Sequence, residues 1–301
     1  MQVSIAYLAV LLIWSTTPLG IVWSSESISP SMAVLLRMVI ALILGGAIIF
    51  IKRISLPWHK QAIRLYSYSA LGVFGGMTFS YLAAQYISSG VLSLTFGLAP
   101  VLSAIFAQRI LAEPTISTLR KLAMLLSFSG LAIVCSDNFS LQANSYLGLL
   151  YVLIAVSLFS LSGVLVKSIS LVIHPMATTV GALSIATPLF FITWLLLDGS
   201  LPVEQWQLRS IWATLYLGVF GSLIGFFAYF YVLQKLSAST VALITLITPV
   251  VALTLGTVFN DEMLNNKIIF GAFLVIAGLA FYYWGEQLIN KRLNTTSFVD
   301  E

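Results

Sequence analysis

Long apolar runs, separated by short polar breaks, follow one another along almost the whole of this sequence. A helix needs about 20 predominantly apolar residues to cross ~30 Å of hydrocarbon, and most of these runs reach that length. Hydrophobic residues make up 59% of the 301 residues, only 8% are charged, and the mean hydropathy is +1.03. A water-soluble domain has far less apolar residue content. The chain is therefore expected to be an all-α polytopic membrane protein.

The apolar runs and the polar breaks between them predict ten transmembrane helices. These are expected near residues 4–23, 31–51, 66–87, 90–111, 118–136, 145–167, 175–197, 210–233, 238–258 and 267–287. The first run follows Met1 and Gln2 without a basic segment and is too long for a signal peptide, so it is interpreted as the first span. Connections such as residues 88–90 hold only a turn, which predicts antiparallel neighbours.

The distribution of lysine and arginine predicts the orientation. With both termini inside, most of the 14 basic residues fall on the inner side. The inner segments carry Lys52, Arg53, Lys60, Arg64, Arg109, Arg120, Lys121, Lys167, Lys235, Lys291 and Arg292. The outer segments carry only Arg209 and Lys267, and Arg37 lies within a span. By the positive-inside rule this predicts cytoplasmic termini. The expected location is the inner (plasma) membrane of a bacterium.

One stretch of the sequence occurs twice. The residues Leu-Gly-Val-Phe-Gly stand at 71–75 and again, unchanged, at 217–221. Each copy runs through an apolar segment to a proline, Pro100 or Pro249, and then to a glutamate. The sequence therefore predicts two repeats, residues 1–138 and 144–288, followed by a cytoplasmic tail, residues 289–301.

The two repeats are expected to be inverted, because each holds an odd number of spans. Residues 55–57 and 200–202 share the sequence Ser-Leu-Pro, yet the connection around the first is basic and the second carries Asp198 and Glu204. A change of charge between related connections is what opposite orientations require. Inverted repeats are typical of secondary transporters, in which two halves rock about a shared site. A membrane scaffold built by duplication without transport is the alternative.

Several functions are excluded by what the spans lack. The 10 acidic residues and both histidines fall in connections, tails or span ends. A protease active site or metal centre within the membrane needs acidic residues or histidines inside the spans. We therefore expect no enzyme activity, no metal and no cofactor. A net charge of +4 spread over membrane connections does not indicate a nucleic-acid partner. The one cysteine, Cys135, excludes an internal disulfide.

Arg37 is the only charged residue placed inside an apolar span. Burying it there costs about 2.5–3.5 kcal/mol on insertion scales. The side chain either reaches the interface or neighbouring carbonyl groups in a structural role, or it meets an anionic group of a substrate, such as a carboxylate. Its nearness to the interface favours the structural role, and the anion contact remains the alternative.

Aromatic residues inside the spans are candidates for the lining of a substrate cavity. These are Trp14, Tyr81, Phe96, Phe159 and Tyr231. Trp14 lies too deep for an interfacial anchor, and its indole N–H needs a partner there.

The prolines Pro100 and Pro249 fall in the middle of their spans. Each removes a backbone donor and frees a carbonyl group, so each predicts a kink. A kink alone and a hinge that opens a cavity are equally compatible with the sequence.

These features together resemble the EamA-type permeases of the drug/metabolite transporter superfamily. The resemblance rests on the two inverted halves and on Trp14, Ser15, Pro30, Arg37, Pro100, Glu113, Gly130, Pro249, Glu262 and Gly278. Two positions depart from the family pattern: Ser15 stands where Gly is common, and Asp261 precedes Glu262 where an apolar residue is usual.

The resemblance implies a central substrate cavity surrounded by spans one to four and six to nine, with the fifth and tenth at the periphery. It also implies that Glu113 and Glu262 cap the helices that begin after them, and it implies export or exchange of amino acids, related metabolites, nucleotide-linked compounds or drugs. We therefore predict a permease that moves a small metabolite by alternating access. An exchanger of a nucleotide derivative, a passive pore and a scaffold are the alternatives. Small-molecule substrate and lipid bilayer are the expected partners, and the sequence is compatible with a homodimer.

Overall fold

The computed structural model describes residues 2–114, 117–141, 144–236 and 238–296, and it contains no strand among them. The helices of the first half are α1 (Val3–Ser24), α2 (Pro30–Lys52), α3 (Lys60–Ala70), η1 (Leu71–Gly76), α4 (Met77–Ala83), α5 (Ser89–Phe96), α6 (Ala99–Ile110) and α7 (Thr118–Leu141). Those of the second half are α8 (Ser145–Lys167), α9 (Pro175–Leu197), η2 (Val203–Gln205), α10 (Leu208–Tyr216), η3 (Leu217–Ile224), α11 (Gly225–Lys235), α12 (Ala238–Asn260) and α13 (Asn266–Thr296).

Each predicted span matches one helix or a run of consecutive helices. Most helix ends lie within a few residues of the predicted ends. Within the described residues, 6 helical segments are long and apolar enough to cross a membrane. They are Val3–Ser24, Pro30–Lys52, Ser89–Ile110, Ser145–Lys167, Pro175–Leu197 and Leu208–Lys235, and Thr248–Asn260 and Asn266–Tyr282 are shorter apolar segments. The third span begins earlier than expected, at Lys60, and α13 continues to Thr296. The count of ten spans stays a prediction.

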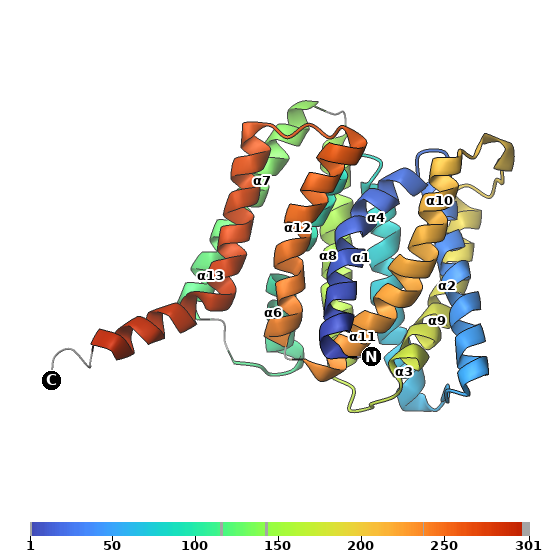
Figure 1. The fold of residues 1–301 in the computed structure, drawn as a ribbon, viewed down its shortest axis with the longest axis horizontal. Helices are drawn as coiled ribbons and strands as arrows, with labels where there is room; N and C mark the ends of the chain where they lie inside the picture. Colours follow the sequence, from blue (N-terminus) through green and yellow to red (C-terminus); the bar gives the residue numbers. More distant parts are fainter. Residues whose placement is uncertain (1, 115–116, 142–143, 237, 297–301) are drawn as a thin grey trace.

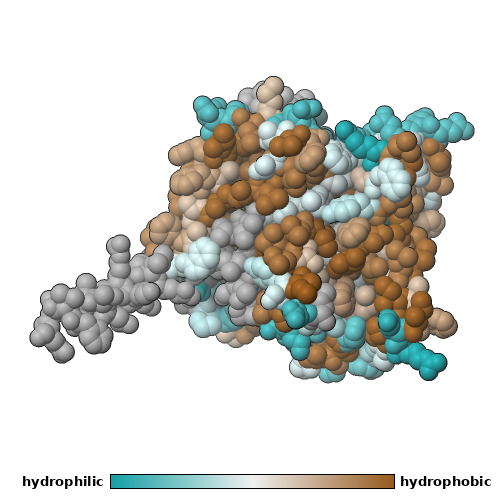
Figure 2. Space-filling view, viewed as in Figure 1, coloured by the Kyte–Doolittle hydropathy of each residue, from teal (hydrophilic) through white to brown (hydrophobic). Residues whose placement is uncertain are grey.

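The surface of the bundle is apolar between its two ends. Large hydrophobic side chains such as Leu8, Phe50, Leu196 and Phe273 are more than half exposed. In Figure 2 apolar residues cover the middle of the visible face, and hydrophilic residues gather near its upper and lower ends. Such a surface is stable only in contact with lipid, so the chain is an integral membrane protein.

The second helix of each half begins in the same way. Pro30 and Pro175 occupy the first turns of α2 and α9, where proline's missing N–H costs nothing. Ser29 Oγ accepts a hydrogen bond from the Met32 N–H at 3.4 Å, and His174 Nδ1 accepts one from the Met176 N–H at 3.2 Å. Side chains therefore take up free N–H groups at both helix starts.

The repeated pentapeptide forms the same unusual structure in both halves. Leu71–Gly76 and Leu217–Ile224 are π-helical segments set between α-helical ones. Their glycines permit close packing: a methyl group on Gly72 would lie 2.6 Å from Ser162 Oγ, and one on Gly218 would lie 2.8 Å from the Ile40 side chain. Single π-turns inside helices are frequent at functional sites, and the second of these lines the cavity described below.

The helices α7 and α13 pack against each other at one edge of the bundle (Figure 1). Their contact depends on small residues. A methyl group on Gly130 would lie 2.6 Å from the Gly271 carbonyl oxygen, and one on Gly278 would lie 2.3 Å from Ser127 Oγ. Backbones can approach this closely only where glycine is present. This arrangement agrees with the peripheral position implied for the fifth and tenth spans.

The two mid-span prolines have different surroundings. Before Pro100 the helix is interrupted: α5 ends at Phe96, and α6 begins at Ala99 with the proline in its first turn. Pro249 instead lies inside the continuous helix α12. Ser160 Oγ donates a hydrogen bond to the Ala99 carbonyl oxygen at 3.0 Å, which ties α8 to the interruption. The hinge role of both prolines stays a prediction.

Candidate functional site

A cavity lies between helices of the two halves. Its lining comes from α1, α2, α4, α5 and α6 of the first half and from α8, η3, α11 and α12 of the second. The lining residues are Trp14, Thr17, Pro18, Ile21, Arg37, Met77, Ser80, Leu92, Ser93, Phe96, Ala99, Phe159, Gly221, Phe226 and Thr248. A volume of about 80 Å³ is open to the centres of water molecules, several times the ~10–15 Å³ that one water needs.

Aromatic rings form one wall of this cavity. The Trp14 ring meets the Phe159 ring edge-on with centroids 5.7 Å apart, and it lies 5.0 Å from the ring of Tyr229 behind it. Phe96 packs edge-on against Phe159 at 6.1 Å. Such offset and edge-on pairs are the favoured geometries of aromatic rings. The cluster holds Trp14 and Phe159 in place and presents an apolar face to a ligand.

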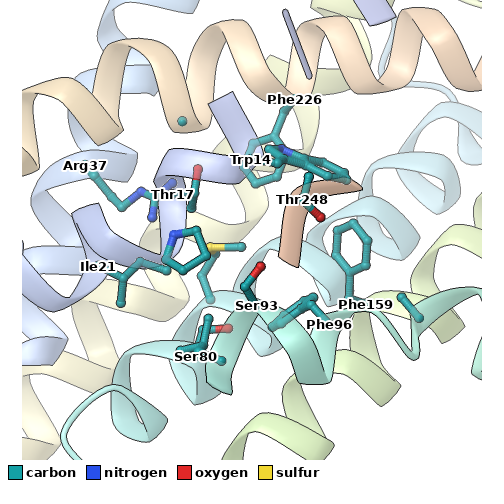
Figure 3. Close-up of a pocket in the computed structure, with 15 residues that line it drawn as sticks. Trp14, Thr17, Ile21, Arg37, Ser80, Ser93, Phe96, Phe159, Phe226 and Thr248 are labelled. Carbon is teal, nitrogen blue, oxygen red and sulfur yellow. The ribbon is translucent and has the colours of Figure 1, made fainter. Parts of the chain in front are cut away.

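Arg37 lies at the other end of the cavity from Phe96 and Phe159 (Figure 3). Its side chain is fully buried, with 0% of its surface exposed. Nε donates a hydrogen bond to Ser222 Oγ at 2.9 Å, whereas Nη1 has no hydrogen-bond partner. No residue that the structure describes forms an ion pair with this guanidinium. A buried guanidinium retains its charge, so the cavity holds an uncompensated cation.

Two neighbours orient the Arg37 guanidinium. Ser222 belongs to the π-helical segment η3 and fixes Nε. The Tyr81 ring lies on the other side, with its centroid 5.8 Å from Arg37 Cζ. The Tyr81 hydroxyl accepts a hydrogen bond from Ser24 Oγ at 3.2 Å. Arg37 is thus held by α4 and η3, one element from each half of the chain.

Four of the six residues predicted to line a cavity do so: Trp14, Arg37, Phe96 and Phe159. Tyr81 is not a lining residue, because its buried ring lies against Arg37 and supports it. Tyr231 does not line the cavity either; its ring lies 6.5 Å from that of Phe227. Two residues along an α-helix differ by about 200° in direction. Since Tyr229 faces Trp14, Tyr231 faces away.

Several lining residues were not singled out from the sequence. Thr17, Ser80, Ser93 and Thr248 bring hydroxyl groups to the cavity. Serine and threonine in membrane helices usually bond to their own backbone, as Thr17 does to the Ile13 carbonyl oxygen at 2.7 Å and Ser80 to that of Gly76 at 2.6 Å. Their presence in the sequence is therefore a weak signal of a site.

Comparison with known proteins agrees with this architecture. The model of the EamA-like transporter family matches the chain twice, over residues 2–136 and 146–284. The chain belongs to the EamA-like transporter family. An uncharacterized transporter of Archaeoglobus fulgidus is 28% identical over 268 residues, which cover 88% of this chain and 93% of the relative.

Bacterial relatives of this EamA-like protein are of similar length. The uncharacterized inner membrane transporter YedA of Escherichia coli is 26% identical over 284 residues, 91% of this chain and 90% of its own. The uncharacterized transporter YoaV of Bacillus subtilis is 22% identical over 283 residues, which cover 92% of this chain and 95% of YoaV. A crystal structure at 18% identity superposes with a TM-score of 0.67 over 93% of this chain and 96% of the other, which shows a shared fold. The protein is a membrane transporter.

The glutamates of this EamA-like protein have unequal surroundings. Glu262 accepts hydrogen bonds from two backbone N–H groups, that of Ser89 at 2.9 Å and that of Gly90 at 3.1 Å. Glu262 therefore caps α5. The expectation that it caps the helix following it in sequence is wrong. Glu113 is exposed and accepts no hydrogen bond from a residue that the structure describes, and its charge acts on Lys167 at the end of α8.

Gly221 allows the guanidinium its position in the cavity. A methyl group at this residue would lie 2.8 Å from Arg37 Nη2. Because Nη2 is the far end of a flexible side chain, we expect Gly221→Ala to shift the guanidinium without unfolding the protein. The shift should weaken binding of an anionic substrate about tenfold, the effect of losing one hydrogen bond to a charged group.

Substrate affinity measured in proteoliposomes for Gly221→Ala and Gly46→Ala checks this expectation. A methyl group on Gly46 meets nothing within 4 Å, so this second variant is a matched control. Equal affinities in the two variants would contradict the placement of Arg37.

Proposed function

We propose that this EamA-like protein is a secondary transporter for a small amphipathic metabolite that carries one anionic group, with a carboxylate as the best match. The observation that supports this most strongly is the fully buried Arg37, whose Nη1 has no hydrogen-bond partner and whose side chain lines the cavity. A charge in this position is costly unless a ligand of opposite sign compensates it.

The chemistry of the ligand follows from the chemistry of the lining. A guanidinium is planar and binds a carboxylate through charge-assisted, often paired, hydrogen bonds. At the other end, Phe96 and Phe159 accept an apolar or aromatic part of the same molecule. Ser93 brings a hydroxyl group between these two ends in Figure 3, and Ser80 and Thr248 add hydroxyl groups to the lining. The substrate is therefore a small molecule with one anionic end and one apolar end.

Alternating access is supported by the arrangement of the connections. The connection after α9 lies beside the start of α2, because Gln207 N–H donates to Ser27 Oγ at 2.9 Å. The connection after α2 begins at the opposite end of that 23-residue helix, roughly 34 Å away at 1.5 Å per residue. The related connections, residues 52–64 and 198–209, thus lie at opposite ends of the bundle (Figure 1), as inverted five-span halves require.

The charge pattern supports cytoplasmic termini in the inner membrane of a bacterium. In that orientation the connection at residues 198–209 faces outward. The bundle end formed by Trp23, Ser89 and Asn260 is called the outer end from here on, and the opposite end is the inner end. Rocking of the two halves would then expose the cavity to each side in turn, and transport rather than catalysis is its activity.

A transporter of a nucleotide derivative is the second candidate. A nucleoside phosphate carries at least two negative charges, and proteins compensate them with several cationic or N–H donors. Arg37 is the only cationic residue among the lining residues that the structure describes. This observation favours a single carboxylate over a phosphate.

Counterflow in proteoliposomes tests the proposal. Vesicles loaded with a panel of small carboxylates and with their neutral methyl esters are diluted into trace labelled substrate. The proposal predicts saturable accumulation of at least one carboxylate and none of its ester. Linear, non-saturating flux would indicate a pore, no flux for any compound would indicate a scaffold, and flux of nucleotide derivatives alone would favour the second candidate.

A further inference from the structure

The Glu262 carboxylate joins the two halves at the outer end of the bundle. Oε1 accepts from the Ser89 N–H at 2.9 Å and Oε2 from the Gly90 N–H at 3.1 Å. Both donors belong to the first turn of α5, in the first half, whereas Glu262 follows α12, in the second half. A carboxylate at a helix N-terminus is favoured by charge-assisted hydrogen bonds and by the helix dipole.

The packing around this contact leaves no space between α5 and α12. A methyl group on Gly90 would lie 2.5 Å from the Leu253 side chain, and one on Gly256 would lie 2.4 Å from Glu262 Oε2. The two glycines therefore let α5, α12 and the carboxylate meet directly. The contact therefore joins one helix of each half directly at this end.

A short chain of hydrogen bonds extends the contact to α1. Asn260 Nδ2 donates to Glu262 Oε1 at 3.3 Å, and Trp23 Nε1 donates to Asn260 Oδ1 at 2.8 Å. Asn260 ends α12, and Trp23 lies in the last turn of α1. Three helices that contribute lining residues to the cavity are thus connected at the outer end through one carboxylate.

Glu113 stands at the corresponding place in the first half. Its backbone N–H donates to the Ala107 carbonyl oxygen at 3.4 Å, as the Glu262 N–H does to that of Gly256 at 3.2 Å. The chain therefore makes the same turn before both glutamates. Glu113 is exposed and accepts no hydrogen bond from a residue that the structure describes, and its charge acts on Lys167 at the end of α8, whereas Glu262 accepts from three donors.

We propose that Glu113 and Glu262 are alternating latches, each of which closes one end of the bundle by capping a helix of the other half. Glu262 is engaged with α5 in the present conformation and holds the outer end closed. In the opposite conformation Glu113 caps the start of α12, where residues 238 and 239 correspond to Ser89 and Gly90 in the repeat, and holds the inner end closed. This inference depends on the alternating-access carrier proposed above.

The two latches have a simple consequence for the equilibrium between conformations. Each carboxylate stabilises only the state in which it is engaged, so removing one shifts the population toward the state held by the other. Loss of Glu262 should favour the outward-open state, and loss of Glu113 should favour the inward-open state. A glutamate that merely stabilises its own loop would shift neither population.

The experiment measures access to the cavity from outside the cell without any substrate. A Cys135→Ser protein carries Ser93→Cys as a reporter in the cavity, and intact cells receive a membrane-impermeant charged maleimide. Glu262→Gln should raise the labelling rate about tenfold, as the loss of one charge-assisted hydrogen bond would. Glu113→Gln should lower the rate. Glu204→Gln, an exposed acid in η2, is the control and should leave it unchanged.

A second variant removes a donor and keeps the carboxylate. Ser89→Pro deletes the N–H group that binds Glu262 Oε1, and proline is tolerated at the first position of a helix. Ser88 before it is already extended, with φ −67° and ψ 159°, which suits a following proline. We expect Ser89→Pro to raise labelling in the same direction as Glu262→Gln, which makes the result independent of whether that variant folds well.

Two results would overturn the latches. The first is an unchanged labelling rate in Ser89→Pro, Glu262→Gln and Glu113→Gln. The second is a change of the labelling rate in the same direction in Glu262→Gln and Glu113→Gln. Because no substrate is present, the outcome is separate from that of counterflow. Opposite shifts without any carboxylate transport would leave the latches standing and refute the proposed substrate class, whereas saturable counterflow with unchanged labelling would refute only the latches.

Discussion

Replacing Arg37 by alanine is expected to reduce transport of the anionic substrate about 100-fold, since a charge-assisted pair in a dry site contributes roughly 3 kcal/mol. The cavity then keeps its aromatic wall and loses the one cation among its described lining residues. The neutral methyl ester should be transported by Arg37→Ala at least as well as by the unchanged protein. Initial rates for acid and ester in proteoliposomes measure the two effects side by side.

Two controls separate recognition from folding. In the unchanged protein Ser222 Oγ accepts a hydrogen bond from Arg37 Nε. Arg37→Gln retains a donor for this oxygen and should show the same loss of carboxylate transport as Arg37→Ala. Arg109→Ala removes an exposed arginine in the last turn of α6 and should transport normally. Carboxylate transport at the unchanged rate in both Arg37 variants would mean that the guanidinium has a structural role only.

Replacing Trp14 by alanine is the second large change that we expect. The substitution removes the ring that packs on Phe159 at 5.7 Å and on Tyr229 at 5.0 Å. Trp14 also lines the cavity, and one ring contact with a substrate contributes ~0.5–1.5 kcal/mol beyond area burial, so the apparent KM for a substrate with an apolar end should rise about tenfold. The effect should shrink for a carboxylate with a very small side chain, because that substrate does not reach the aromatic wall.

Trp14→Phe should restore most of the affinity, since it keeps a ring in contact with Phe159. Trp212→Ala is the matched control, because Trp212 is 67% exposed on the apolar surface of α10. The dependence of counterflow on substrate concentration gives the apparent KM of the three variants. An unchanged KM in Trp14→Ala would place the substrate away from this wall.

The positions of the helices could be read from the sequence with little error. Apolar runs, the prolines that start α2 and α9, and the turns between spans all depend on local chemistry. Trp14, Phe96 and Phe159 could also be recognised, because large rings inside apolar spans need partners. Arg37 was found for the same reason, since a lone charge inside a span must face the protein interior.

Other features depend on contacts that the sequence does not display. Nothing local distinguishes Tyr229, which meets Trp14, from Tyr231, which faces away. Nothing near Glu262 indicates that its partners are Ser89 and Gly90 in the other half. A repeated pentapeptide suggests a shared role, but the π-helical turn that it forms rotates the following residues and changes which of them face the cavity.

The inverted relation of the two halves underlies both the carrier and the latches, and sided labelling of two related connections tests it most directly. Ser55→Cys and Ser200→Cys, both at exposed positions, are each placed in a Cys135→Ser background and treated in intact cells with an impermeant thiol reagent. Inverted halves predict that only the cysteine at position 200 reacts from outside, and that the one at position 55 reacts only after the membrane is opened. Reaction of both from the same side would contradict this prediction.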